Sequence, residues 1–506
     1  MELPQTPSPA VTNPRRGGFL FMAILALGLY AVLVFCNASG VAAGSDQAGY
    51  FNHARLIAAG SLHARERELP GFPAERAPWF LYVPLGFRPA PDNVGMVPTY
   101  PPGLPLLMLA ARPFAGWERS ADIVLVVHAI AGLLLTWWLA RALGLTRPWA
   151  VLAVAIVGAS PLYLFFSVEA MSDMPSMVWV AGAVLAAWRA RDNPRWAAAA
   201  GCAMGFSMLM RPTNLLALAP IALALGRPSA RPWDKARRWL WLALGGLPCA
   251  AFFFLHNRAA YGEYFTTGYG DIGYDFGTRW IGTTLGHFAH WLPILFTPAV
   301  CFVLGLPWVA RSAPRPVALL GVWIAGYVAL YSTYKPSHEA WWYLRFLLPA
   351  APALVIGGLL GLRLTAGRLP RGISRRTMFA LALFCVVAPS LYWSRRLHVF
   401  RIPRGELVYS QAANWMKLNL PPDAVVFCSQ TSAALYFYTD FTVVRWDSVK
   451  PDSREAVMAA ARASARPVYA ALFPFETSPA FANALPGHWS PVGDVGHISI
   501  WRLDSR

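Results

Sequence analysis

The stretch FLFMAILALGLYAVLVFC (residues 19–36), followed closely by SDQAGYFNHA (residues 45–54), decides the fold of this chain. The first stretch is long and apolar enough to cross a lipid bilayer, because a spanning helix needs about 20 predominantly apolar residues. No clear A-x-A cleavage pattern follows it, so we expect an uncleaved first helix. The second stretch brings a carboxylate, Asp46, to the boundary of the membrane directly after this helix.

The composition of the whole chain is that of a polytopic α-helical membrane protein. Of its 506 residues, 56% are hydrophobic and only 13% are charged, and the mean hydropathy is +0.42. A soluble globular protein has about 25% charged residues. Apolar runs of spanning or near-spanning length predict about eleven transmembrane helices. These runs cover residues 19–38, 120–140, 149–167, 175–189, 196–210, 213–226, 238–256, 290–310, 316–332, 345–362 and 377–394.

The net charge of +18 follows the topology and does not indicate nucleic-acid binding. Arginines gather in alternate loops between the apolar runs, which is the positive-inside pattern and not one basic face. This pattern predicts a cytoplasmic N-terminal tail over residues 1–18 and a long first outer loop over about 39–119. Four arginines near helix ends on the outer side are exceptions: Arg112, Arg119, Arg395 and Arg396.

After the membrane part, residues 19–395, the composition changes. Residues 396–506 alternate helical patterns with β-rich runs at 424–428, 441–446, 467–473 and 497–503. Such alternation is typical of a small α/β domain with a largely parallel sheet, and the topology puts it outside the cytoplasm. No Gly-rich loop opens its helices, so we expect a cap or docking surface and not a nucleotide site.

The first outer loop begins with Asp46. Residues 50–60 then have Tyr50, Ala54 and Ile57 at helical spacing, which predicts an interfacial amphipathic helix. The loop ends with TYPPGLP (residues 99–105), whose paired prolines fix an extended turn before a second interfacial segment. From the residues alone, Asp46 is either a helix cap or solvated acid, or a functional carboxylate.

Two further polar sites follow apolar runs on the same side. In SVEAMSDMP (residues 167–175), Glu169 and Asp173 are four apart and share one face if the segment is helical. Asp173 can equally cap the next helix. Arg211 is either an anchor that extends its side chain to the interface or a bidentate phosphate ligand.

The densest polar segment is YKPSHEAWWYLRFLLP (residues 334–349). Lys335, His338 and Arg345 gather positive charge suited to a phosphate, whereas its aromatic residues also fit an interfacial belt. The loop over 257–289 contains Tyr269 and Asp271 among other aromatic and polar residues. Its composition suits sugar stacking as well as an ordinary interfacial loop.

Together, three of these features resemble the GT-C glycosyltransferases. They are Asp46 after the first membrane helix, the Pro101-Pro102 turn that closes the first outer loop, and the Arg345-Phe-Leu-Leu-Pro signature late in the chain. The likeness covers roughly residues 15–395 and is to the protein O-mannosyltransferase and lipid A aminoarabinose transferase branch. Two positions depart from that branch, where Glu often stands at Gln47 and Lys at Tyr100.

The resemblance implies an integral-membrane glycosyltransferase of the bacterial cytoplasmic membrane. It would move a hexose or pentose from a polyprenyl phosphate to a lipid, glycan or protein acceptor on the outer face. The residues we expect in the site are Asp46 and Asp173 as catalytic groups, Arg345, Lys335, Arg211 and His338 at the donor phosphate, and Tyr100, Glu169, Tyr269 and Asp271 at the substrates. A Mg or Mn ion shared by Asp46 and Asp173 would be compatible with these oxygen ligands, but nothing in the sequence requires it.

The sequence leaves two other classes of function open. A multi-pass transporter or lipid flippase usually has charges near the middle of the membrane and inverted repeats. This chain has boundary charges on one side, and no repeat is evident in it. A structural scaffold would leave the clustered polar residues without a role. The glycosyltransferase therefore explains more of the sequence.

Overall fold

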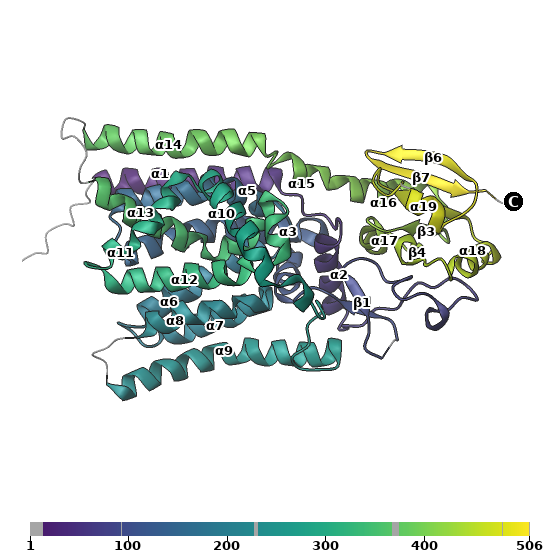
Figure 1. The fold of residues 1–506 in the computed structure, drawn as a ribbon, viewed down its shortest axis with the longest axis horizontal. Coiled ribbons are helices and arrows are strands. Elements are labelled where there is room, and N and C mark those ends of the chain that lie inside the picture. The colour runs from purple at the N-terminus through teal and green to yellow at the C-terminus, as the bar shows by residue number, and fades with distance from the viewer. Residues whose placement is uncertain (1–13, 93, 227–230, 367–373, 478, 505–506) are drawn as a thin grey trace, which may run out of the picture.

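The computed structural model describes residues 14–92, 94–226, 231–366, 374–477 and 479–504. Figure 1 shows an elongated molecule in which a bundle of long helices occupies one end and a small sheet domain the other. The loop after the first helix lies between them (Figure 1). We call the end of the bundle that faces the sheet domain the site end. Most of the predicted N-terminal tail and several predicted cytoplasmic arginines, such as Arg227 and Arg368, lie outside the described residues.

Each predicted apolar run lies in helical structure. The helices of the bundle are α1 (Pro14–Asn37), α3 (Gly103–Ala142), α4 (Arg147–Ala159), α5 (Pro161–Val168), α6 (Asp173–Arg189), α7 (Trp196–Met210), η2 (Pro212–Ala217), α8 (Leu218–Leu225), α9 (Pro232–Tyr261), α10 (Ile281–Leu295), η5 (Pro298–Gly305), α11 (Leu306–Val309), α12 (Pro314–Ser332), η7 (Trp341–Ala350), α13 (Ala351–Ala366) and α14 (Arg375–Arg396). Among the described residues, 5 helices are long and apolar enough to cross a membrane, or up to 7 if each bent pair is one span. The predicted count of about eleven spans is therefore not confirmed.

Breaks in the helices explain part of this difference. α4 and α5 meet at an angle of 57° where Ser160 caps α5 and Pro161 begins it. The helices over 278–295 and 298–309 meet at 120°, where Thr297 has a φ of 67° and Pro298 follows. Proline cannot donate the backbone hydrogen bond that would continue the preceding helix. One apolar run in the sequence thus becomes two short helices.

Glycines let α7 and α9 approach closely. A Cβ on Gly201 would lie 1.9 Å from the Leu242 oxygen, and one on Gly245 would lie 2.0 Å from the Ala198 oxygen. Small residues at such contacts allow backbones to pack, as is usual between membrane helices. This packing fixes the end of α9 beside the site described below.

The first outer loop contains α2 (Asp46–Ala58), η1 (Ala74–Arg76) and a hairpin of β1 (Phe87–Pro89) with β2 (Met96–Pro98). The predicted helix over 50–60 is confirmed as part of α2, but its setting differs. Residues 47–54 are all buried, because α2 packs against α3 on one side and the sheet domain on the other. After the paired prolines α3 begins at Gly103, and Gly116 (φ 63°, ψ −173°) breaks this helix before its membrane part.

The sheet domain has five strands in the order β4-β3-β5-β7-β6. Its elements are α15 (Arg401–Gly405), α16 (Leu407–Asn419), β3 (Val425–Cys428), α17 (Ser432–Tyr438), β4 (Thr442–Arg445), η8 (Trp446–Ser448), α18 (Arg454–Ala463), β5 (Val468–Leu472), α19 (Pro479–Ala484), β6 (Trp489–Val495) and β7 (Ile498–Leu503). The four predicted strands are present, whereas β6 was not predicted. β3 pairs in parallel with β4 and β5, but β7 pairs antiparallel with β5 and β6. The sheet is therefore mixed and not largely parallel.

Candidate active site

Asp46 lies at the site end of the bundle, at the start of α2, with both carboxylate oxygens engaged. The Tyr100 hydroxyl donates to Oδ1 at 2.5 Å, and Nη1 of Arg345 donates to Oδ2 at 3.3 Å. The Ser45 hydroxyl lies 2.8 Å from the same tyrosine oxygen. The Asp46 side chain keeps 33% of its surface exposed, so it is oriented by protein groups and still open to a reactant.

Tyr100 is held on its ring and at its backbone. Its ring packs on Gly49, where a Cβ would lie 2.5 Å from two ring carbons. Nδ1 of His53 lies 3.1 Å from the Tyr100 carbonyl oxygen, and Nε2 of His53 lies 3.2 Å from Nε2 of His256 on α9. Burial and the Asp46 charge raise the pKa of Tyr100 well above its ordinary value. The tyrosine therefore remains a donor to Asp46 at neutral pH.

A second carboxylate–guanidinium pair lies at the start of α6. Nη2 of Arg211, directly after α7, is 2.6 Å from Oδ1 of Asp173, whose side chain is fully buried. Ser172 accepts a hydrogen bond from the Tyr50 hydroxyl at 2.9 Å and from Nε of Arg211 at 3.4 Å. Tyr50 also contacts the Tyr100 ring, with centroids 5.0 Å apart. The second pair is thus joined to the Asp46 site through α2.

Arg345 brings the two pairs together. Its guanidinium carbon lies 5.3 Å from the Phe346 ring centroid, and that of Arg211 lies 5.5 Å from the same centroid. Nε of Arg345 is buried and has no hydrogen-bond partner among the described residues. A buried N–H without a partner is unusual in a folded protein.

Glu169 reaches the site through Gln47, the neighbour of Asp46. The Gln47 side-chain amide donates a hydrogen bond to Oε2 of Glu169, and both residues are buried. Burial, followed by the nearby charge of Glu406, raises the pKa of Glu169 to about 8. Glu169 is therefore mostly protonated at neutral pH and adds little negative charge beside Asp46.

The other expected site residues make fewer contacts with Asp46 and its partners, or none that the structure describes. The Tyr269 ring lies 6.1 Å from that of Tyr100, so it borders the site. Lys335 is exposed in η6 (Lys335–His338), and among the described residues it has no hydrogen bond or ion pair with this cluster. His338 lies against Thr284 and the Trp280 ring. Asp271 is exposed and accepts a hydrogen bond from the Gly273 amide at 2.9 Å, so it caps its own turn.

Tyr50, Ser172 and the two histidines were not predicted as members of the site. Tyr50 and Ser172 are separated by 122 residues, and His53 and His256 by 203. In the sequence, the one indication for His53 is its place in the helical segment that follows Asp46. Their pairing depends on how the loops meet, which the spacing of residues does not reveal.

The described residues contain no group of three or more His, Cys, Asp or Glu side chains arranged to hold a metal ion. Instead, the two carboxylates expected to share a cation each contact an arginine. A guanidinium supplies positive charge and fixed hydrogen-bond donors to a carboxylate or phosphate. A metal shared by Asp46 and Asp173 stays a prediction, and this arrangement does not require it.

Comparison with known proteins supports the resemblance. Residues 101–255 match the family model described as dolichyl-phosphate-mannose-protein mannosyltransferase. No curated protein sequence matches the chain significantly.

Among solved structures, ArnT from Cupriavidus metallidurans bound to undecaprenyl phosphate matches with a TM-score of 0.62 and 15% identity, over 96% of this chain and 98% of that one. The archaeal oligosaccharyltransferase AglB from Archaeoglobus fulgidus, in complex with an inhibitory peptide and a dolichol-phosphate, matches with a TM-score of 0.52 and 12% identity, over 95% and 74%. The arabinofuranosyltransferase AftD from Mycobacteria matches with a TM-score of 0.53 and 14% identity, over 95% and 40%. The predicted resemblance is therefore confirmed: this chain has the fold of the GT-C glycosyltransferases.

Proposed function

We propose that this protein is an integral-membrane glycosyltransferase that takes its sugar from a polyprenyl phosphate. The observation that carries the proposal is the Asp46 carboxylate, held between Tyr100 and Arg345 at the site end of the bundle and still partly exposed. The fold is shared with ArnT, whose structure contains undecaprenyl phosphate, and with AglB, whose structure contains a dolichol-phosphate. Both support a donor of this chemical class.

In the proposed reaction, Asp46 is the general base. It takes the proton from an acceptor hydroxyl or amine while the acceptor atom forms a bond to the anomeric carbon of the sugar. The bond between that carbon and the phosphate oxygen breaks, and the phosphate leaves with the electron pair. Tyr100 and Arg345 each hold one oxygen of Asp46 by a hydrogen bond, and the exposed third of the side chain leaves room for the acceptor.

The leaving phosphate requires positive charge that is already in place. Arg345 and Arg211 lie on the same aromatic ring, Phe346, and Arg345 has an N–H without a partner among the described residues. Such preorganised donors stabilise charge that develops in a transition state without further rearrangement. We assign the donor phosphate to Arg345 first and to Arg211 second, and Lys335 and His338 to its outer approach.

The neutral form of Glu169 explains how a second acid can lie near Asp46. A protonated Glu169 bonded to Gln47 does not repel the carboxylate. We therefore give Glu169 the role of orienting the first turn of α2, and Tyr269 that of a wall for the sugar.

The arrangement of arginines leads us to propose that transfer does not depend on a divalent cation. EDTA should leave the rate of transfer by purified protein within about twofold, because Arg345 and Arg211 supply the charge that a metal would. Addition of Mg or Mn after EDTA should then not increase the rate of transfer. A loss of activity in EDTA that either ion reverses would contradict it.

We also propose that the site end faces the outside of the bacterial cytoplasmic membrane. The support is the excess of arginine in the loops at the opposite end. A transporter or flippase was the alternative in the sequence, but no feature of the site favours it. Cysteine labelling of intact cells tests the orientation: Asp440→Cys, exposed in the sheet domain, should react with a membrane-impermeant reagent.

The function is tested by transfer with purified protein in lipid nanodiscs. Polyprenyl phosphates carrying a hexose, a pentose or an aminosugar are supplied, and mass spectrometry follows the loss of the donor and the modification of envelope extracts. Asp46→Asn should reduce transfer by about 10²–10⁴-fold, since Asn cannot take a proton. Asp271→Asn, which changes an exposed turn, is the matched control. Transfer by the Asp46 variant at the wild-type rate would overturn the proposal.

A further inference from the structure

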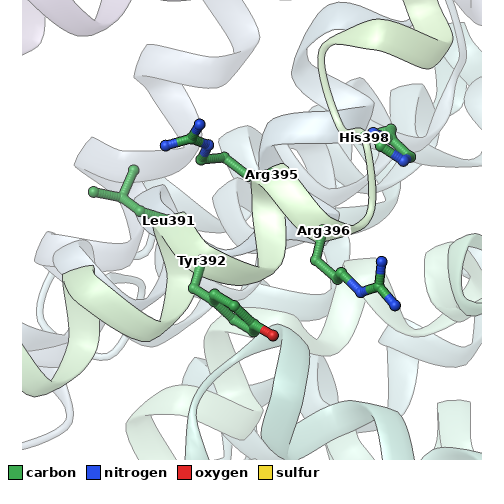
Figure 2. A pocket seen from close by; sticks show the side chains of 5 residues that line it. All are labelled: Leu391, Tyr392, Arg395, Arg396 and His398. Atoms are coloured by element: carbon green, nitrogen blue, oxygen red, sulfur yellow. The ribbon is translucent and has the colours of Figure 1, made fainter.

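The site-end terminus of α14 carries a feature that the proposed reaction does not use. Five residues line an open hollow of about 580 Å³ there: Leu391, Tyr392, Arg395, Arg396 and His398. Figure 2 shows Leu391 and Arg395 leaving one flank of the helix, Tyr392 and Arg396 the other, and His398 beyond the helix end. The hollow is thus formed by two basic and two largely apolar side chains of one helix, and the His398 ring lies at its edge.

The two guanidinium groups in this hollow form no ion pair with a carboxylate in the described part of the chain. Arg395 and Arg396 are exposed, and neither side chain has a hydrogen bond or ion pair with any described residue. By contrast, Arg345 and Arg211 each contact a carboxylate. Both side chains line the same hollow, so an anion in it would be attracted by two positive charges that no described carboxylate neutralises. Arginine binds phosphate particularly well, through parallel N–H donors.

The membrane-facing side of α14 supplies an apolar path to this hollow. Only 17% of the apolar window of this span is buried inside the protein. Leu381, Phe384 and Leu391 are exposed on it by 57%, 67% and 56%. Their spacing of three and seven residues, and the further four to Arg395, puts all four on one face of the helix. This face therefore presents apolar side chains along the membrane-spanning part of α14 and the positive charge of Arg395 at its end.

This position is opposite to the general distribution of charge in the chain. Arginine is concentrated in the loops at the far end of the bundle, whereas this pair lies at the site end, where α14 leads into α15. A simple anchor that extends its charge into the interface explains one arginine. It does not explain why two arginines adjoin a hollow that Tyr392 also lines. Nor does it explain the exposed apolar side chains that lead to this hollow along the same helix.

We propose that Arg395 and Arg396 bind the phosphate headgroup of an anionic phospholipid of the surrounding bilayer, with an acyl chain lying along Leu391, Phe384 and Leu381. Tyr392 and His398 border the headgroup. The site is separate from Asp46 and does not depend on the proposed reaction. Its ligand class is a glycerophospholipid with a negative headgroup, and phosphatidylglycerol is the probe.

The test measures bound lipid on the full-length protein. Wild-type protein and the variant Arg395→Gln/Arg396→Gln are reconstituted with phosphatidylcholine and titrated with labelled phosphatidylglycerol, and native mass spectrometry counts the lipids retained. The wild type should retain at least one more phosphatidylglycerol than the variant, and the affinity should fall by about tenfold or more when both charges are removed. Arg395→Lys/Arg396→Lys, which keeps the charge but loses the paired donors, should bind with intermediate affinity.

The control removes two exposed arginines that do not line the hollow, Arg65 of the first outer loop and Arg112 of α3, in the variant Arg65→Gln/Arg112→Gln. It should keep the bound lipid. Equal loss in the control would overturn the proposal in favour of general surface charge. Equal retention of phosphatidylcholine and phosphatidylglycerol by the wild type would also overturn it. Displacement by a polyprenyl phosphate at lower concentration than by phosphatidylglycerol would assign the hollow to the sugar donor and overturn the phospholipid as ligand.

Discussion

At the scale of single residues, the Arg211–Asp173 pair and the Arg345–Asp46 pair differ in burial, which predicts different consequences of mutation. Asp173 is fully buried and contacts Arg211 at 2.6 Å, whereas Asp46 keeps a third of its surface exposed. Removal of one partner of a buried pair leaves an uncompensated charge, which costs about 3–5 kcal/mol. An exposed carboxylate is instead solvated by water when its partner is lost.

Arg211→Met should therefore destabilise the protein by about 3–5 kcal/mol, and Arg211→Met/Asp173→Asn should recover much of this loss. Arg345→Met should change thermal stability much less and weaken donor binding. Thermal unfolding in detergent measures the first effect, and the donor KM measures the second. Equal destabilisation by Arg211→Met and the double variant would show that the pair is not coupled.

Glu169 predicts a pH dependence of stability whose sign follows from its raised pKa. Its pKa is about 8 in the folded protein and about 4.5 in an unfolded chain, so the folded state binds the extra proton between these values. The contribution of neutral Glu169 to the free energy of unfolding is complete below about pH 4.5 and is lost as the pH rises through about 8. Glu169→Gln keeps an acceptor for Gln47 but does not titrate.

Unfolding temperatures measured from about pH 5 to about pH 9 should fall for the wild type and fall less for Glu169→Gln. Glu263→Gln, which changes an exposed carboxylate, is the control and should follow the wild type. Parallel curves for wild type and Glu169→Gln would mean that Glu169 is already ionised at neutral pH.

The residues of the site were predictable in part. Asp46 and Arg345 each follow or begin an apolar run at the same end of the bundle, and the sequence shows this. It does not show which arginine meets which carboxylate, because Asp46 and Arg345 are 299 residues apart. The hydrogen bond between Gln47 and Glu169 could not be predicted for the same reason, because these residues are 122 positions apart. Lys335, by contrast, fits the charge pattern of the sequence, but it is exposed and has no hydrogen bond or ion pair with these residues in the described part of the chain.

Among the elements, α2 positions Tyr100 against Asp46 through a glycine. Gly49 lies one turn after Asp46, and Tyr100 packs directly on it. In Gly49→Ala the new methyl group would overlap the Tyr100 ring, which cannot retreat because its hydroxyl and its carbonyl oxygen are both hydrogen-bonded. Overpacking of this kind costs about 1–3 kcal/mol and moves side chains.

We expect Gly49→Ala to lower transfer by about tenfold or more, with the protein still folded, since displacement of a positioning group by about 1 Å can cost up to 10²-fold. Gly282→Ala, where nothing lies within 4 Å of the new Cβ, is the matched control. Tyr100→Phe separates the two roles of the tyrosine, because it keeps the ring and removes the donor. Normal transfer by Gly49→Ala would show that the ring position is unimportant.

Elements were predicted more securely than their surroundings. The helical period of residues 50–60 gave the helix, but a buried face and a membrane-facing face have the same period. What covers α2 is α17, from a part of the chain almost 400 residues away. In the sheet domain β6 was missed because Pro491 and Gly493 interrupt its pattern, and the pairing shifts register between them.

At the scale of the whole molecule, the sheet domain is bound to the loop that carries Asp46. Asn52 donates to the Ala433 oxygen at 3.2 Å, and the Arg55 guanidinium lies 3.5 Å from the Phe437 ring centroid. The Leu85 amide donates to the Ser432 hydroxyl at 3.1 Å. These contacts connect α17 to α2 and its loop, so we expect the sheet domain to help hold α2 in place.

Arg67 makes three hydrogen bonds across this interface. Its guanidinium donates to the carbonyl oxygens of Thr439 at 2.7 Å, Tyr436 at 3.1 Å and Phe441 at 3.2 Å. It thereby satisfies carbonyl groups at the C-terminal end of α17, where the helix dipole also favours a positive charge. Loss of these bonds would leave several backbone acceptors without partners at an interface between two parts of the fold.

Arg67→Ala should therefore loosen the sheet domain from the first outer loop. Hydrogen exchange of both α17 and α2 should increase, and transfer should fall although Asp46 and its partners are unchanged. Arg76→Ala, which removes an exposed arginine of the same loop, should change neither. Faster exchange in α17 with unchanged exchange in α2 and full transfer would show that the domain only covers the site. Coupled changes would show that Asp46 is positioned by residues more than 350 positions away in the chain, which explains why its environment could not be predicted from the sequence around it.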